Sequence, residues 1–139
     1  MKWKLIFLLS LFGLAMAFAT TFWIHTRIEP FFWLVIFIIC AYLIARYATS
    51  RYFLHGLLVS IVNSFWITSV HILLFHQYMG FHPMMAQKMA DMNTPLAGHP
   101  LRMMAVTGPL IGVLSGLVLG LFAFVAARLM KKNQPVTNL

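Results

Sequence analysis

Residues 105–127 read AVTGPLIGVLSGLVLGLFAFVAA, an apolar run without a single charged side chain. A helix needs about 20 apolar residues to cross a bilayer core about 30 Å thick, so this run predicts a transmembrane helix. Three other apolar stretches predict further spans: Leu5–Ile24, Phe31–Ala45 and Phe53–Tyr78. We therefore expect an all-α fold, an integral membrane bundle of four transmembrane helices. It should form one domain over residues 1–132, followed by a short disordered cytoplasmic tail at residues 133–139.

The composition supports a membrane protein and excludes several soluble classes. Of the 139 residues, 62% are hydrophobic and only 9% are charged, with a formal net charge of +8. A soluble domain averages about 25% charged residues, and so few charges could not cover a water-facing surface. The lipid bilayer is thus the expected partner, and nucleic acid is not. The acids Glu29 and Asp91 are far apart in sequence, and Cys40 is the single cysteine, so we expect no enzymatic activity and no catalytic residues.

Basic residues between the apolar runs predict the orientation in the membrane. One side would carry Lys2, Lys4, Arg46, Arg51, Arg128, Lys131 and Lys132, and the other Arg27, Lys88 and Arg102. Cytoplasmic loops are enriched in Lys and Arg, so this bias predicts that both termini are cytoplasmic. A basic N-terminus on a short chain with several spans fits a multi-pass protein of the bacterial inner membrane.

The N-terminal apolar segment also has features of a secretory signal peptide. Lys2 and Lys4 precede it, and Ala15-Met16-Ala17 fits an A-x-A cleavage site. Cleavage there would leave three spans. The apolar run continues to Ile24, however, which gives it the full length of a spanning helix.

Glycines recur at every fourth position of the last span, a glycine-zipper pattern formed by Gly108, Gly112, Gly116 and Gly120. Each glycine costs a helix about 1 kcal/mol relative to alanine, so four on one face indicate close packing of helices. We expect this face to pack on the first span. The alternative is a seam between copies of the chain in a homo-oligomer.

Polar side chains form a stripe on one face of the third span, composed of Ser60, Asn63, Ser64, Thr68 and His71. Such a stripe forms hydrogen bonds between helices or lines a pathway through the bundle. His71 is an ionisable residue well inside a span, which makes it a candidate functional group.

Histidines and methionines gather in the outer loop between the third and fourth spans. Pro83 is well placed to begin a short helix over residues 83–92, which we expect to lie at the membrane surface. Thioether and imidazole ligands suit Cu(I), so this loop offers a candidate copper site. Its candidate ligands are His76, His82, Met85, Met89 and Met92.

Three functions are consistent with these patterns. The leading hypothesis is a small inner-membrane protein without enzymatic activity or cofactor, an accessory or scaffold subunit that packs or oligomerises through the glycine face. The second is a periplasm-facing protein that binds or transfers Cu(I) through the His/Met loop. The third is a small oligomeric channel or transporter whose third helix lines the path, with His71 as its titrating group.

Overall fold

The computed structural model describes residues 1–96 and 98–132, and these residues form helices and short connections without a strand. Four helices are long and apolar enough to cross a membrane, which confirms the expected all-α fold with four candidate spans. The predicted tail at residues 133–139 lies outside the described residues. The helices are α1 (Trp3–Phe22), α2 (Glu29–Tyr47), α3 (Tyr52–Leu73), α4 (Phe75–Phe81), α5 (Pro83–Asp91) and α6 (Pro100–Lys132).

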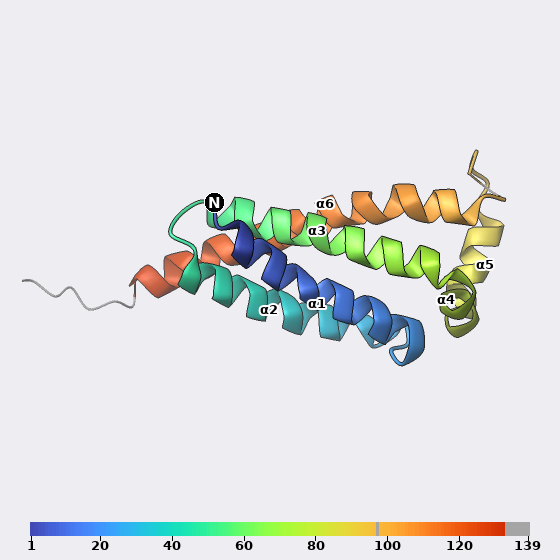
Figure 1. The fold of residues 1–139 in the computed structure, drawn as a ribbon, viewed down its shortest axis with the longest axis horizontal. Helices are drawn as coiled ribbons and strands as arrows, with labels where there is room; N and C mark the ends of the chain where they lie inside the picture. The colour runs from blue at the N-terminus through green and yellow to red at the C-terminus, as the bar shows by residue number, and fades with distance from the viewer. Residues whose placement is uncertain (97, 133–139) are drawn as a thin grey trace, which may run out of the picture.

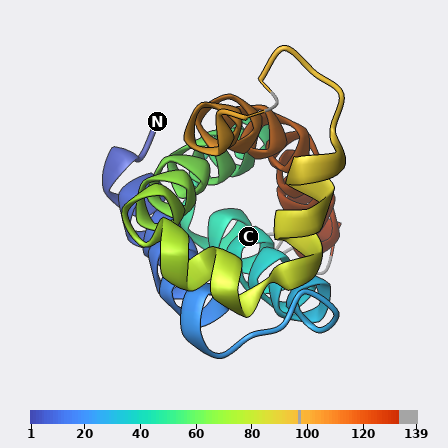
Figure 2. The ribbon, with the colours of Figure 1, turned by 90° about the vertical axis from the view of Figure 1, so that its right-hand side faces the viewer.

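The four long helices surround a common axis (Figures 1 and 2). Helix α3 packs most extensively on α6, α1 lies along α3, and α2 lies along α6, whereas α1 and α2 touch only sparsely. The N-terminus and the C-terminal part of α6 lie together at one end, here called the terminal end. Helices α4 and α5 lie across the opposite end, here called the loop end.

The apolar core occupies the terminal half of the bundle. Its most deeply buried side chains come from all four long helices: Ile6, Leu9, Cys40, Ala41, Ile44, Val59, Leu119 and Ala123. Towards the loop end, buried polar side chains such as Thr20, His71 and His82 accompany the apolar ones. The terminal half therefore holds the helices together, and the loop half is free to enclose a cavity.

The glycine face of α6 packs on α3. A Cβ atom built at Gly116 or Gly120 would collide with Leu57 or Phe53 of α3, and one at Gly108 or Gly112 with α3 hydroxyl side chains. The expected close packing is thus present, but the expected partner was wrong, because this face meets α3 rather than α1.

The choice of partner follows from the small residues of α3. A Cβ built at Gly56 of α3 would lie 2.7 Å from the Cα of Gly120, so the two backbones are in direct contact there. In α1, Gly13 packs against the side chain of Asn63 of α3. Helix α3 is therefore flanked by α1 and α6, and each contact uses glycine to bring a neighbour close.

Two predicted helix boundaries were wrong. The third span does not continue to Tyr78, because the chain turns at Leu74 and α4 begins at Phe75. This turn brings the ring of Tyr78 back onto His71, with the ring centroids 4.0 Å apart. The last helix begins at Pro100 rather than at Ala105, so Pro109 lies inside it. The short helix predicted near Pro83 is present as α5.

Candidate functional site

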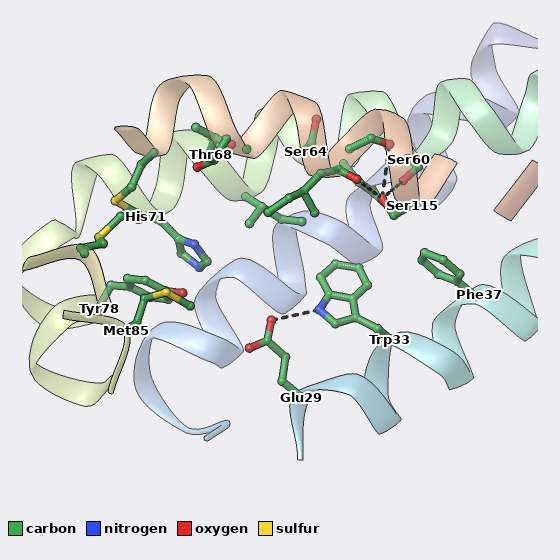
Figure 3. Close-up of a pocket in the computed structure, with 18 residues that line it drawn as sticks. Glu29, Trp33, Phe37, Ser60, Ser64, Thr68, His71, Tyr78, Met85 and Ser115 are labelled. Atoms are coloured by element: carbon green, nitrogen blue, oxygen red, sulfur yellow. Dashed lines mark hydrogen bonds between the residues drawn. The ribbon is translucent and has the colours of Figure 1, made fainter. Parts of the chain in front are cut away.

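A cavity of about 400 Å³ lies in the loop half of the bundle (Figure 3). Its walls are α2, α3 and α6, and residues of α4 and α5 contribute to its lining at the loop end. Most of the lining is apolar, with a few polar groups. Cavities of about 300–1,000 Å³ with this mixed character are typical of small-molecule sites.

The whole predicted polar stripe lies on the α3 wall of this cavity. Its members are Ser60, Asn63, Ser64, Thr68 and His71. The Ser60 and Ser115 hydroxyls are 2.7 Å apart, which links α3 to α6 (Figure 3). The hydroxyl of Ser64 donates to the carbonyl of Ile61 within its own helix. The stripe therefore supplies both a hydrogen bond between helices and the polar side of a cavity.

Asn63 is the least satisfied polar residue of the described structure. Its side chain is only 3% exposed, and its Oδ1 atom has no hydrogen-bond partner among the described residues. That side chain packs against Gly13, where an added Cβ would lie 2.5 Å from Oδ1. A buried polar atom without a partner costs about 1–3 kcal/mol. Asn63 thus carries an energetic cost at the wall of the cavity.

Histidines and threonines close the loop end of the bundle against α1. The Nε2 atom of His71 is 3.0 Å from the Thr20 hydroxyl. His82 is held at both nitrogens, with Nε2 2.7 Å from the Thr20 carbonyl and Nδ1 2.7 Å from the Thr26 hydroxyl. Tyr78 lies between the two imidazoles, 4.0 Å from the ring of His71 and 4.6 Å from that of His82. These contacts fix α4 against α1 and hold His71 at the cavity.

Burial raises the pKa of the Tyr78 phenol to about 12, and the negative charge of Glu29 adds to this effect. Both causes disfavour the phenolate, so Tyr78 is neutral and able to donate a hydrogen bond at physiological pH.

The α2 wall consists of Glu29, Trp33 and Phe37, which sequence reasoning did not connect with a site. The indole Nε1 of Trp33 donates to Oε1 of Glu29 over 3.1 Å, and the Trp33 and Phe37 rings meet edge to face. In Figure 3, Glu29 and His71 point into the same space. The i, i+4, i+8 spacing places these three α2 residues on one helix face, and this spacing was the sequence signal that could have indicated a shared site.

The same three residues also border a second hollow, a groove between α2 and α6. Val118 and Phe122 form its α6 side. Leu34 and Val118 are about half exposed, so the groove lies on the outer surface of the bundle. Glu29, Trp33 and Phe37 therefore lie between the cavity and the outer surface of the bundle.

The predicted copper ligands lie in different surroundings. Met85 and Met89 line the cavity. His82 is buried with both nitrogens in hydrogen bonds, whereas His76 is exposed and Met92 lies exposed beyond the end of α5. In residues 1–96 and 98–132, no three His, Cys, Asp or Glu side chains form a group that could hold a metal ion. Copper binding remains a prediction of the sequence alone.

No protein-family model matches this chain, and no curated protein or solved structure matches it. Fold and cavity therefore define its class: an all-helical chain with four candidate membrane-spanning helices and an internal cavity.

Proposed function

We propose that this chain is a non-enzymatic accessory protein of the bacterial inner membrane that binds an amphipathic molecule from the bilayer in its cavity. One observation carries the proposal. Asn63 lines a cavity that is otherwise largely apolar, and its buried amide oxygen, which packs against Gly13 of α1, has no partner among the described residues. A polar group that costs stability without an internal partner is typical of a functional site.

The cavity's neighbourhood supports access from the membrane rather than from water. The groove between α2 and α6 shares Glu29, Trp33 and Phe37 with the cavity and is otherwise bordered mainly by apolar side chains. Movement of the Trp33 and Phe37 side chains would join the two spaces. A lipid-like molecule could then insert sideways without crossing the loop end.

The distribution of charge supports an orientation with both termini in the cytoplasm. The loop end, formed by the α1–α2 connection, α4, α5 and the beginning of α6 (Figure 1), carries Arg27, Lys88 and Arg102, and most other basic residues belong to the terminal end. The positive-inside rule then makes the loop end periplasmic. Helix α5 would lie at the outer membrane surface, because Met85 and Met89 face the cavity while Gln87 and Lys88 are exposed.

An oligomer built through the glycine face is less well supported. Gly108, Gly112, Gly116 and Gly120 already meet side chains of α3 within the chain, so a second copy would have to displace α3. Any partner protein would instead contact the exposed apolar surfaces of α2 and α6. For example, Phe31 and Leu129 are 70% and 59% exposed.

Asn63→Leu tests the proposed function because leucine has the same branched shape without polar atoms. We expect the purified variant to lose the co-purifying amphiphile seen by native mass spectrometry, while its thermal stability in detergent stays equal or rises. Ile67→Trp should also exclude the amphiphile, by filling the cavity. Ser69→Ala, on an exposed position of α3, is the matched control and should retain it.

Two results would reject the proposed function. One is a wild-type protein that carries no amphiphile after mild extraction and takes up none from added lipid. The other is retention of the full amphiphile complement by both Asn63→Leu and Ile67→Trp.

A further inference from the structure

Among the described residues that line the cavity, Glu29 supplies the only acidic group. Its one polar contact among the described residues is the hydrogen bond from Trp33, and no Lys or Arg side chain pairs with it there. A carboxylate can accept about four hydrogen bonds, so most of its capacity is unused. Glu29 also lies in the first turn of α2. An acidic side chain without a Lys or Arg partner among the described residues thus borders the cavity.

Aromatic rings share the cavity with this carboxylate. Trp33 contacts it directly, Tyr78 lies at the cavity on α4, and Phe37 lies farther along the same face of α2 (Figure 3). The faces of aromatic rings attract cations, and tryptophan does so most strongly. A carboxylate beside aromatic rings is a suitable environment for an ammonium group. An anionic head group would instead meet the carboxylate of Glu29, with no Lys or Arg side chain among the described residues that line the cavity.

The polar and apolar parts of the site match a molecule with a short head and a hydrocarbon tail. Glu29, Trp33 and Phe37 border both the cavity and the groove between α2 and α6. A head group bound at Glu29 can therefore leave its tail along Val118 and Phe122, on the lipid-facing side of the bundle. An entirely polar cation would leave this apolar surface unused.

We infer that the cavity selects an ammonium-bearing amphiphile, with the ammonium at Glu29 and Trp33 and the alkyl chain in the groove between α2 and α6. This inference rests on the proposed function and adds the charge of the ligand to it. The ammonium could belong to an aminophospholipid of the outer leaflet or to a free alkylammonium compound.

The experiment compares three probes of equal chain length: dodecyltrimethylammonium, the neutral dodecylglycerol and the anionic dodecylphosphate. Binding to the full chain in lipid nanodiscs is followed by tryptophan fluorescence and native mass spectrometry. We expect the wild type to bind the ammonium probe most tightly. Glu29→Gln should weaken that binding by about tenfold or more and leave the neutral probe unchanged, because only the charge interaction is lost.

Two further variants keep the test decisive. Asp91→Asn removes the other acid of the chain, which lies exposed at the end of α5, and should not change binding of any probe. Trp33→Leu removes an aromatic face while keeping the site apolar, so it should reduce the preference for the ammonium probe over the neutral one. Trp33→Leu therefore provides an independent test of the ammonium inference if Glu29→Gln does not fold.

The outcomes separate the two proposals. Equal affinity for the ammonium and neutral probes, unchanged by Glu29→Gln or Trp33→Leu, would overturn the ammonium inference and leave the proposed function standing. Failure of the wild type to bind any probe would count against the proposed function itself. In nanodiscs of mixed phosphatidylethanolamine and phosphatidylglycerol, retention of the former identifies a bilayer source. Retention of neither lipid, together with tight binding of the ammonium probe, identifies a free amphiphile.

Discussion

The contact between Gly56 and Gly120 allows a sharp test of the packing of α3 on α6. In Gly56→Ala, the new methyl group would lie 2.7 Å from the backbone of Gly120 and from the carbonyl oxygen of Leu119. These are backbone atoms, which cannot rotate away as a side chain can. The two helices would therefore have to separate by about 0.7 Å at this point before ordinary contact distances are restored.

The expected cost follows from this separation. Overpacking of a well-packed interface costs about 1–3 kcal/mol, and backbone contact favours the upper part of that range. Replacement of glycine by alanine in a helix also gains up to about 1 kcal/mol, which offsets part of the cost. Gly80→Ala separates these effects, because Gly80 lies in α4 with no atom within 4 Å of its added Cβ. We expect Gly56→Ala to be less stable than Gly80→Ala by about 1–3 kcal/mol.

Reversible unfolding in mixed micelles, titrated with sodium dodecyl sulfate and followed by far-ultraviolet circular dichroism, measures this difference. Gly120→Ala should have a similar cost, because its Cβ would lie 2.7 Å from the carbonyl oxygen of Phe53. The double variant Gly56→Ala/Gly120→Ala should lose less free energy of unfolding than the sum of the two single-variant losses, because one separation of the helices relieves both collisions. Equal stability of Gly56→Ala and Gly80→Ala would refute the close approach of the two backbones.

Three further predictions use other parts of the structure. The fold raises the pKa of Tyr78 to about 12 from an ordinary value of about 10, so the neutral phenol should stabilise the folded state below pH 10. The free energy of unfolding should therefore fall between about pH 10 and 12. In thermal unfolding scans, Tyr78→Phe should lack this decrease. His55 accepts a hydrogen bond from the backbone N–H of Lys2 at Nε2 and donates one from Nδ1 to the Arg51 carbonyl. His55→Phe should therefore lower the free energy of unfolding by about 1–3 kcal/mol in the same detergent titration. An unchanged unfolding midpoint would contradict this prediction. In a Cu(I) competition titration, the wild type and Met85/Met89→Ala should bind equally, because both nitrogens of His82 are already engaged in hydrogen bonds. Tight binding that is lost in the variant would support the copper hypothesis instead.

Hydropathy and periodicity predicted the parts of this fold that depend on one helix at a time. An apolar run long enough to cross a bilayer specifies a span without reference to its neighbours, so all four candidate spans were recognised. The polar stripe from Ser60 to His71 was recognised in the same way, because 3.6-residue periodicity places its members on one face.

Sequence patterns within one helix could not predict features that depend on contact between two helices. The glycines of the last span predict close approach to a neighbour, but they do not specify which neighbour, and α3 rather than α1 occupies that position. The cavity arises from the arrangement of several helices. Glu29 alone is typical of a helix start, and Trp33 alone is typical of a membrane interface. Their role at the cavity becomes visible only when α3 and α6 are placed opposite α2.

The central position of α3 has a consequence for how the chain is made. Ribosomes complete α1 and α2 before α3, so α3 can meet α1 as soon as it enters the membrane. Its other flank, with Gly56, Ser60 and Ser64, has no partner until α6 has been synthesised and inserted. During that interval a polar helix surface faces lipid, where neighbouring side chains or ordered water must satisfy it. The newly made protein therefore passes through an incomplete bundle that membrane chaperones and proteases can recognise, and the arrival of α6 ends that exposure.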